Sequence, residues 1–408
     1  MPGVPRLVRW VPEGAEPWVG LLLISRGLRA FADGYVAILL PVYLLALGLG
    51  PAQVGLMASL TLLGSALSTL ALGAWGHRLG VARSLQGAAL LMAATGLAFA
   101  AGGSFWPLAL VAVVGTLNPS SGDVSVFLPL EHAQLAQAAN GEARTRLFAR
   151  YSLMGALLAA LGSVAAAMPE WLPGVDRLLV LRGMFVLYGL VGLLVWGLYR
   201  QLPRTQALAA GHQAAPLAAS RRVVWRLAAL FSVDSFAGGM AVSSLMALWL
   251  FKRFDLSLAT ASHYFLWAGL LSSLSQLAAP WLARRIGLLN TMVFTHIPAN
   301  VCLMLAAISP RLELALALLL LRSLLSQMDV PARSAFVMAV VTQPERAAAA
   351  SFTAVPRSLA SALSPAIGGA LLASGWLAAP LLVCGGLKIA YDLAIWQAFR
   401  RHRVAADF

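Results

Sequence analysis

Eleven charged side chains lie well inside long apolar stretches of this 408-residue sequence. In such surroundings, ionised groups form ion pairs, bind charged solutes or carry protons. At the centre of a membrane-spanning helix, each costs about 2.5–3.5 kcal/mol unless it is paired or hydrated. We therefore expect these groups to face a protein interior. They are Arg26, Arg29, Asp33, Asp123, Asp234, Arg322, Asp329, Arg333, Arg357, Lys388 and Asp392.

Spacing predicts partners for some of these charges. Opposite charges four residues apart share one face of a helix, and the sequence has three such pairs: Arg29–Asp33, Asp329–Arg333 and Lys388–Asp392. Each pair is either an internal salt bridge that orients its helix or part of a binding site.

Two aspartates have no opposite charge within four residues on the same predicted helix. Asp123 and Asp234 either pair across helices with Arg357 or Arg26, or carry protons. The second alternative rests on desolvation, which favours the neutral form of a carboxyl group.

One segment combines polar side chains with residues that break helices. It reads Asn118-Pro119-Ser120-Ser121-Gly122-Asp123. A broken helix is tolerated in a membrane where it borders a cavity or lies within protein. Here Asn118, Ser120 and Ser121 either contact a solute or belong to a kinked packing helix. Farther along the same stretch, Glu131 is predicted to join a cytoplasmic cluster with Arg144, Arg146 and Arg150.

The composition is that of a membrane protein. Hydrophobic residues make up 60% of the chain and charged residues 11%, whereas soluble domains are about 25% charged. A hydrocarbon core is crossed by about 20 apolar residues, which predicts twelve spans. Their residues are 18–47, 52–75, 84–103, 106–135, 146–168, 178–199, 223–250, 258–282, 290–308, 312–342, 347–373 and 377–398.

The sequence contains an internal repeat of about 200 residues. Gly122-Asp123-Val124 resembles Met328-Asp329-Val330, and Phe31-Ala32-Asp33-Gly34 resembles Phe236-Ala237-Gly238-Gly239. We expect an N-terminal six-helix bundle at 1–199, a cytoplasmic linker at 200–222 and a C-terminal six-helix bundle at 223–408. Of the basic residues outside the span centres, 18 fall on one side and five on the other, which predicts both termini in the cytoplasm.

Other classes of function find little support. The net charge of +14 is scattered and forms no basic block, so no nucleic acid is expected as a partner. The two cysteines, Cys302 and Cys384, and the six histidines show no ligand spacing, so neither metal nor cofactor is expected.

The segment after the second span resembles a signature of the major facilitator superfamily, Gly-x-x-x-Asp-Arg-x-Gly-x-x-Arg. Matching residues are Gly73, Arg78, Gly80 and Arg83, while His77 stands at the acidic position. Arg284-Arg285-Ile286-Gly287 is a degenerate copy in the second half, and Gly48-Leu49-Gly50-Pro51-Ala52-Gln53-Val54-Gly55 resembles the family's first outer loop.

This resemblance implies an all-α membrane protein of twelve transmembrane helices in two parallel six-helix repeats. Spans 1, 4, 7 and 10 would line a central cavity, and the two halves would rock about it. The loop of Gly73, His77, Arg78, Gly80 and Arg83 would act in gating. Since His77 offers no negative charge, the gating ion pair of the family lacks its acid here.

Two hypotheses of function follow. The first is a monomeric secondary transporter in the cell (inner) membrane, which moves a small organic solute and is coupled to protons through buried aspartates. Its site residues would be Arg29, Asp33, Asn118, Asp123, Asp234, Asp329, Arg333 and Arg357. The alternative is a polytopic membrane enzyme or sensor without alternating access. Both would contact membrane lipids, and the direction of transport stays open.

Overall fold

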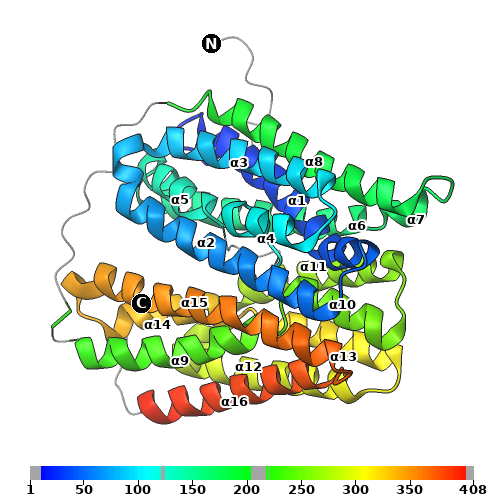
Figure 1. Ribbon diagram of the computed structural model, residues 1–408. Helices are drawn as coiled ribbons and strands as arrows, with labels where there is room; N and C mark the ends of the chain where they lie inside the picture. Colours follow the sequence, from blue (N-terminus) through cyan, green and yellow to red (C-terminus); the bar gives the residue numbers. More distant parts are fainter. Residues whose placement is uncertain (1–10, 121–124, 204–216, 219, 401–408) are drawn as a thin grey trace. The chain divides into compact units, whose positions relative to one another are not determined.

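The computed structural model describes residues 11–120, 125–203, 217–218 and 220–400, except for the side chains of residues 73–79, 141 and 347. All regular secondary structure in these residues is helical. The chain divides into two compact units (Figure 1), one of Met1–Leu49 with Leu60–Gly211 and one of Gly50–Ser59 with His212–Phe408.

The first unit contains three long helix pairings. Helix α1 packs against α6 and α8, and α3 packs against α8. The helices of the first half of the chain are α1 (Val19–Ala46), α2 (Pro51–Leu79), α3 (Val81–Ala101), α4 (Phe105–Val114), α5 (Phe127–Ala138), α6 (Gly141–Ala165), α7 (Met168–Trp171) and α8 (Arg177–Tyr199).

The second unit repeats these pairings. Helix α9 packs against α15 and α16, and α12 packs against α16. Its helices are α9 (Arg221–Gly239), α10 (Ser243–Phe254), α11 (Leu258–Ile286), α12 (Leu288–Ile308), α13 (Leu312–Leu325), α14 (Asp329–Val340), α15 (Arg346–Ala373) and α16 (Ala379–Phe399), with a 3-10 turn at Gln343–Glu345.

Three of the predicted spans are interrupted. The break predicted in span 4 is confirmed, because α4 ends at Val114 and α5 begins at Phe127. Spans 7 and 10 were expected to be continuous, but they break between α9 and α10 and between α13 and α14. Within the described residues, nine segments are long and apolar enough to cross a membrane. The count of twelve spans stays a prediction.

Two pairs of consecutive helices are separated by a single glycine. Residues 73–83 were predicted to include a loop, but α2 continues to Leu79 and only Gly80 separates it from α3. Gly80 has φ = 76°, and Gly287 between α11 and α12 has φ = 86°. Glycine adopts this backbone region at no steric cost, so one residue is enough to end one helix and start the next.

Glycines also allow α1 and α9 to cross closely over a partner helix. A Cβ atom at Gly34 of α1 would collide with the Ala159 carbonyl of α6, and one at Gly162 would collide with Phe31. In the second unit, a Cβ atom at Gly239 of α9 would collide with α15 at Ser361 and Ser364. Backbone approaches backbone at these crossings, a packing that small residues permit in membranes.

Candidate functional site

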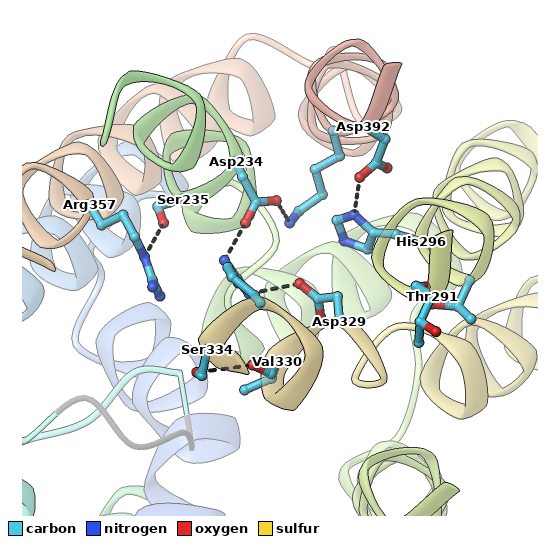
Figure 2. A network of polar contacts seen from close by, with 12 residues as sticks. Asp234, Ser235, Thr291, His296, Asp329, Val330, Ser334, Arg357 and Asp392 are labelled. Carbon is cyan, nitrogen blue, oxygen red and sulfur yellow. Dashed lines mark hydrogen bonds and ion pairs between the residues drawn. The ribbon is translucent and has the colours of Figure 1, made fainter. Parts of the chain in front are cut away.

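A chain of alternating charges runs through the second unit. Asp234 of α9 lies between two cations: its Oδ2 is 2.9 Å from Nη1 of Arg333, and its Oδ1 is 2.6 Å from Nζ of Lys388. Nη2 of Arg333 lies 2.7 Å from Oδ2 of Asp329. Figure 2 shows Asp234 and Asp329, each joined by a dashed line to the guanidinium between them.

These four side chains come from three helices, and helix breaks place two of them. Asp329 is the first residue of α14, where the positive end of the helix dipole favours a carboxylate. Pro331 falls in the first turn of α14, which is where a helix tolerates proline. Asp234 lies one turn before the end of α9. The pair predicted at Asp329–Arg333 is confirmed.

All four side chains are buried, and their exposed fractions are between 4% and 9%. Two carboxylates and two cations balance in formal charge, and Asp234 accepts two charge-assisted hydrogen bonds. Removing one member of such a network leaves a partner uncompensated in the interior, which is strongly unfavourable.

Arg357 of α15 lies beside this network of charged side chains. Its Nε donates to the hydroxyl of Ser235 at 3.2 Å (Figure 2), and the residue is half-buried. Within the described residues Arg357 forms no ion pair. The alternative that Asp234 pairs with Arg357 or Arg26 is therefore wrong, because Arg333 and Lys388 occupy both of its oxygens.

A second buried pair lies next to the chain. Nδ1 of His296 on α12 is 3.0 Å from Oδ1 of Asp392 on α16 (Figure 2), and both residues are buried. The Lys388–Asp392 pair predicted from spacing is wrong, since Lys388 turns to Asp234 and Asp392 turns to His296.

The first unit has its own polar cluster, centred on Glu131 of α5. This carboxylate is fully buried and accepts hydrogen bonds from Arg29 of α1, Tyr151 of α6 and Tyr199 of α8, the last at 2.6 Å. The guanidinium of Arg29 also lies over the ring of Phe127, with its carbon 4.1 Å from the ring centroid. One carboxylate thus joins four helices.

Two predictions for this region are wrong. Glu131 does not join the arginines that were predicted to be cytoplasmic: Arg146 lies within 3.6 Å of the exposed Glu142 instead, and Arg144 donates to Ala139 and Asn140. Arg29 forms its ion pair with Glu131 and not with Asp33. The apolar surroundings of α5 bury Glu131, and tertiary partners then outweigh the same-helix spacing.

The remaining predicted residues are spread over several positions. Asn118 is buried, and its Oδ1 accepts from the backbone and hydroxyl of Ser120 at 3.1 and 2.7 Å. Asp33 is buried on α1, and Arg83 is exposed on α3. Asp123 lies outside the described residues. Gly73, His77 and Arg78 belong to α2 by their backbone, but their side chains are outside the described part.

The sequence contains a signal for Glu131 that spacing alone does not use. Pro129 and Pro331 both lie at the third position of their helices, α5 and α14. Glu131 and Arg333 follow these prolines by two residues, so alignment at the prolines makes Glu131 the counterpart of Arg333. No group of three or more metal-ligating side chains occurs in the described residues.

Comparison with known families gives one family match. A model of the Major Facilitator Superfamily matches residues 22–324. The uncharacterized membrane protein YJR124C of Saccharomyces cerevisiae is 24% identical over 420 residues, which covers 92% of this chain and 93% of the yeast protein.

Solved structures share the fold at low sequence identity. The nucleoside transporter NupG has a TM-score of 0.72 at 14% identity, covering 94% of this chain and 100% of that one. The D-xylose-proton symporter has a TM-score of 0.71 at 13% identity, with 93% and 98% covered. A bacterial homolog of the human lysosomal transporter Spinster has 0.70 at 14% identity, with 94% and 96% covered.

Proposed function

Because this chain belongs to the Major Facilitator Superfamily, we propose that it is a secondary transporter of a small organic solute. It works by alternating access and is coupled to protons through buried carboxylates of the second unit. Asp234 and Asp329 are the carboxylates, while Arg333, Lys388 and Arg357 are the cations that they and the solute share.

The observation that carries this proposal is that Asp234 forms ion pairs with two cations at once. Its two oxygens accept from Arg333 and Lys388, so α9, α14 and α16 are held together through one carboxylate. A proton on Asp234 removes the charge that holds both cations. The solute and the proton then compete for the same network, and competition of this kind couples two fluxes.

Several features complete the proposed transporter. Six-helix bundles at 1–199 and 223–408 rock about a solute site, joined by a cytoplasmic linker at 200–222. The monomer spans the cell membrane with both termini in the cytoplasm. The solute-binding residues proposed for the first unit are Arg29, Asp33, Asn118 and Asp123, and the segment of Gly73, His77, Arg78, Gly80 and Arg83 acts in gating.

A panel of candidate solutes for screening is chosen by the chemical groups that this network could bind. The cation Arg357 has no carboxylate partner within the described residues and offers a fork of donors to a carboxylate, phosphate or hydroxyl group. Nucleosides and pentoses enter the panel because two transporters of similar fold are described with such solutes. A thermal-shift screen of the panel finds a ligand by its stabilisation of the folded protein.

Transport in proteoliposomes tests the coupling. With a solute from the screen, proteoliposomes with an acidic interior should accumulate it through the wild-type protein, because protons that leave on the transporter are exchanged for the competing solute. Asp234→Asn and Asp329→Asn should abolish this accumulation in correctly folded protein. Glu142→Gln is the matched control, since Glu142 is exposed and belongs to a surface pair. Coupled transport that survives both aspartate substitutions would remove these residues from the proposal.

Alternating access separates a transporter from a membrane enzyme or sensor. Ser235→Cys, in a background with Cys302 and Cys384 replaced by serine, places a thiol beside Arg357. An impermeant maleimide should reach this thiol from either face of the membrane, with solute changing the balance. The exposed Trp376, replaced by cysteine, is the control that labels from one face only. Labelling of the Ser235 position from one face in every condition would favour the alternative.

A further inference from the structure

The pair of His296 and Asp392 is incomplete as a hydrogen-bonded unit. Oδ1 of Asp392 meets Nδ1 of His296 at 3.0 Å, whereas Oδ2 of Asp392 is buried without a hydrogen-bond partner. The exposed fractions are 1% for Asp392 and 4% for His296. An ionised carboxylate with one unsatisfied oxygen is unfavourable in such a place. A shared proton on the pair removes this uncompensated charge.

Lys388 lies between the His296–Asp392 pair and the network of alternating charges. It precedes Asp392 by four residues on α16, so both side chains lie on one helix face. Its Nζ is 2.6 Å from Asp234, while Asp392 lies one turn away along its own helix. Lys388 therefore lies near two carboxylates, Asp234 and Asp392, and contacts Asp234.

The ionisable groups that act on Asp392 come from three helices of the second unit, α9, α12 and α16. They are Asp234 on α9, His296 on α12 and Lys388 on α16, and Asp392 in turn acts on Tyr391, its neighbour in sequence. Arg357 on α15, which also packs against α16, acts on Asp234 and Asp329 instead.

The pair has the chemistry of a proton site. Imidazole changes charge in the physiological range of pH, and a neighbouring carboxylate decides where its proton resides. One proton on the pair gives either neutral Asp392 with neutral His296, or a carboxylate with an imidazolium. When this proton leaves to water, His296 is neutral and Asp392 carries an uncompensated negative charge.

We propose that His296 and Asp392 hold a further proton of the transport cycle, besides the one proposed for Asp234, and that this proton switches Lys388 between two carboxylates. While the pair holds the proton, Lys388 stays on Asp234. After the proton has left to water, the Asp392 carboxylate attracts Nζ of Lys388, and Asp234 keeps Arg333 alone. Only a proton and hydrogen-bond partners change place. This inference deepens the proposed proton coupling and rests on it for its role in transport.

Infrared difference spectroscopy tests the proton site without any solute. The reconstituted wild-type protein, titrated over the range in which histidine changes charge, should show a carboxylic-acid band that disappears as pH rises. Asp392→Asn should remove this band, and His296→Gln should move its midpoint. His263→Gln is the control, because His263 is exposed and contacts only a backbone carbonyl. A titrating band that persists unchanged in both Asp392→Asn and His296→Gln would overturn the assignment.

The switch itself has a separate readout. Lys388→Gln should move the midpoint of the Asp392 band to higher pH, because the cation that stabilises the carboxylate is gone. A second comparison sets the double variant Asp234→Asn/Lys388→Gln against Asp234→Asn alone. In the double variant neither partner of the Asp234–Lys388 pair is charged, so the shift of the Asp392 midpoint again reports the loss of Lys388. An unmoved midpoint in both comparisons would contradict the switch.

Transport assays separate this inference from the proposed function. Asp392→Asn should keep solute exchange at equal pH and lose accumulation driven by a pH gradient, whereas Asp234→Asn should lose both. A wild-type protein without proton-driven accumulation would defeat the proposed coupling, yet the infrared titration would still decide the proton site. Coupled accumulation by Asp392→Asn would defeat the inference alone.

Discussion

Arg29 of α1 donates a hydrogen bond to Glu131 of α5, and both side chains are buried. The second unit has the same pair with the charges exchanged, since Asp234 of α9 binds Arg333 of α14. Arg29 and Asp234 both lie two residues before a Phe-Ala dipeptide, and Glu131 and Arg333 both lie two residues after a proline. The repeat thus keeps an ion pair and reverses its sign.

Glu131 should be essential for the stability of the first unit. Glu131→Gln removes the charge that Arg29 pairs with and leaves a buried guanidinium uncompensated. We expect a loss of about 3–5 kcal/mol, measured by thermal unfolding in detergent. Glu142→Gln removes an exposed pair and should change the stability by less than about 1 kcal/mol. Equal effects of the two substitutions would contradict the buried role of Glu131.

The ring of Phe127 should contribute to the position of Arg29. Phe127→Leu keeps an apolar side chain but removes the aromatic face that lies 4.1 Å from the guanidinium carbon. The expected loss of stability is about 0.5–2 kcal/mol beyond the change in buried area. Phe127→Trp, which keeps an aromatic face, is the comparison. The prediction fails if leucine and tryptophan at this position unfold at the same temperature.

Asp234 and Lys388 should show strong coupling in a double-mutant cycle. Asp234→Asn leaves Lys388 without its carboxylate, and Lys388→Met leaves Asp234 with one cation fewer. Each single variant should be markedly destabilised, while the double variant should recover much of the loss because no unpaired charge remains from that pair. Thermal unfolding of the four proteins gives the coupling energy. Additive single effects would show that the two side chains act independently.

The helix crossing at Gly34 should tolerate no side chain. Gly34→Ala places a methyl group against the backbone of Ala159, so α1 and α6 must separate and the yield of folded protein should fall sharply. Gly27→Ala is the matched control on the same helix, because its new methyl group meets Leu158 at 3.4 Å, an ordinary contact. Size-exclusion chromatography of the purified proteins measures the difference. Normal yields from Gly34→Ala would show that the crossing can widen.

Sequence spacing predicted partners where both residues lie on one helix and nothing nearer competes. Asp329–Arg333 is such a pair, and it forms as expected. Lys388–Asp392 has the same spacing, but Asp234 approaches Lys388 from another helix 154 residues away in sequence. Local geometry gives a set of possible partners, and the packing of α9 against α16 selects among them.

The partners of Glu131 could not be predicted, because they depend on contacts between helices that are far apart in the sequence. Glu131 precedes a group of arginines in sequence, which suggested a surface cluster. Its actual partners, Arg29, Tyr151 and Tyr199, lie on three other helices. The break in span 4 was visible through Pro119 and Gly122. The break in span 10 has a weaker signal, because Pro331 lies within the first turn after it.

Each of these buried ion pairs forms within one unit, and this has a consequence for synthesis and membrane insertion of the protein. Arg29 meets Glu131, and Asp234 meets Arg333 and Lys388, without borrowing a counter-charge from the other half of the polypeptide. A nascent first half leaving the ribosome already carries the counter-charge of Arg29. Separate synthesis of two fragments cut between residues 203 and 217 is therefore compatible with insertion of each into the bilayer.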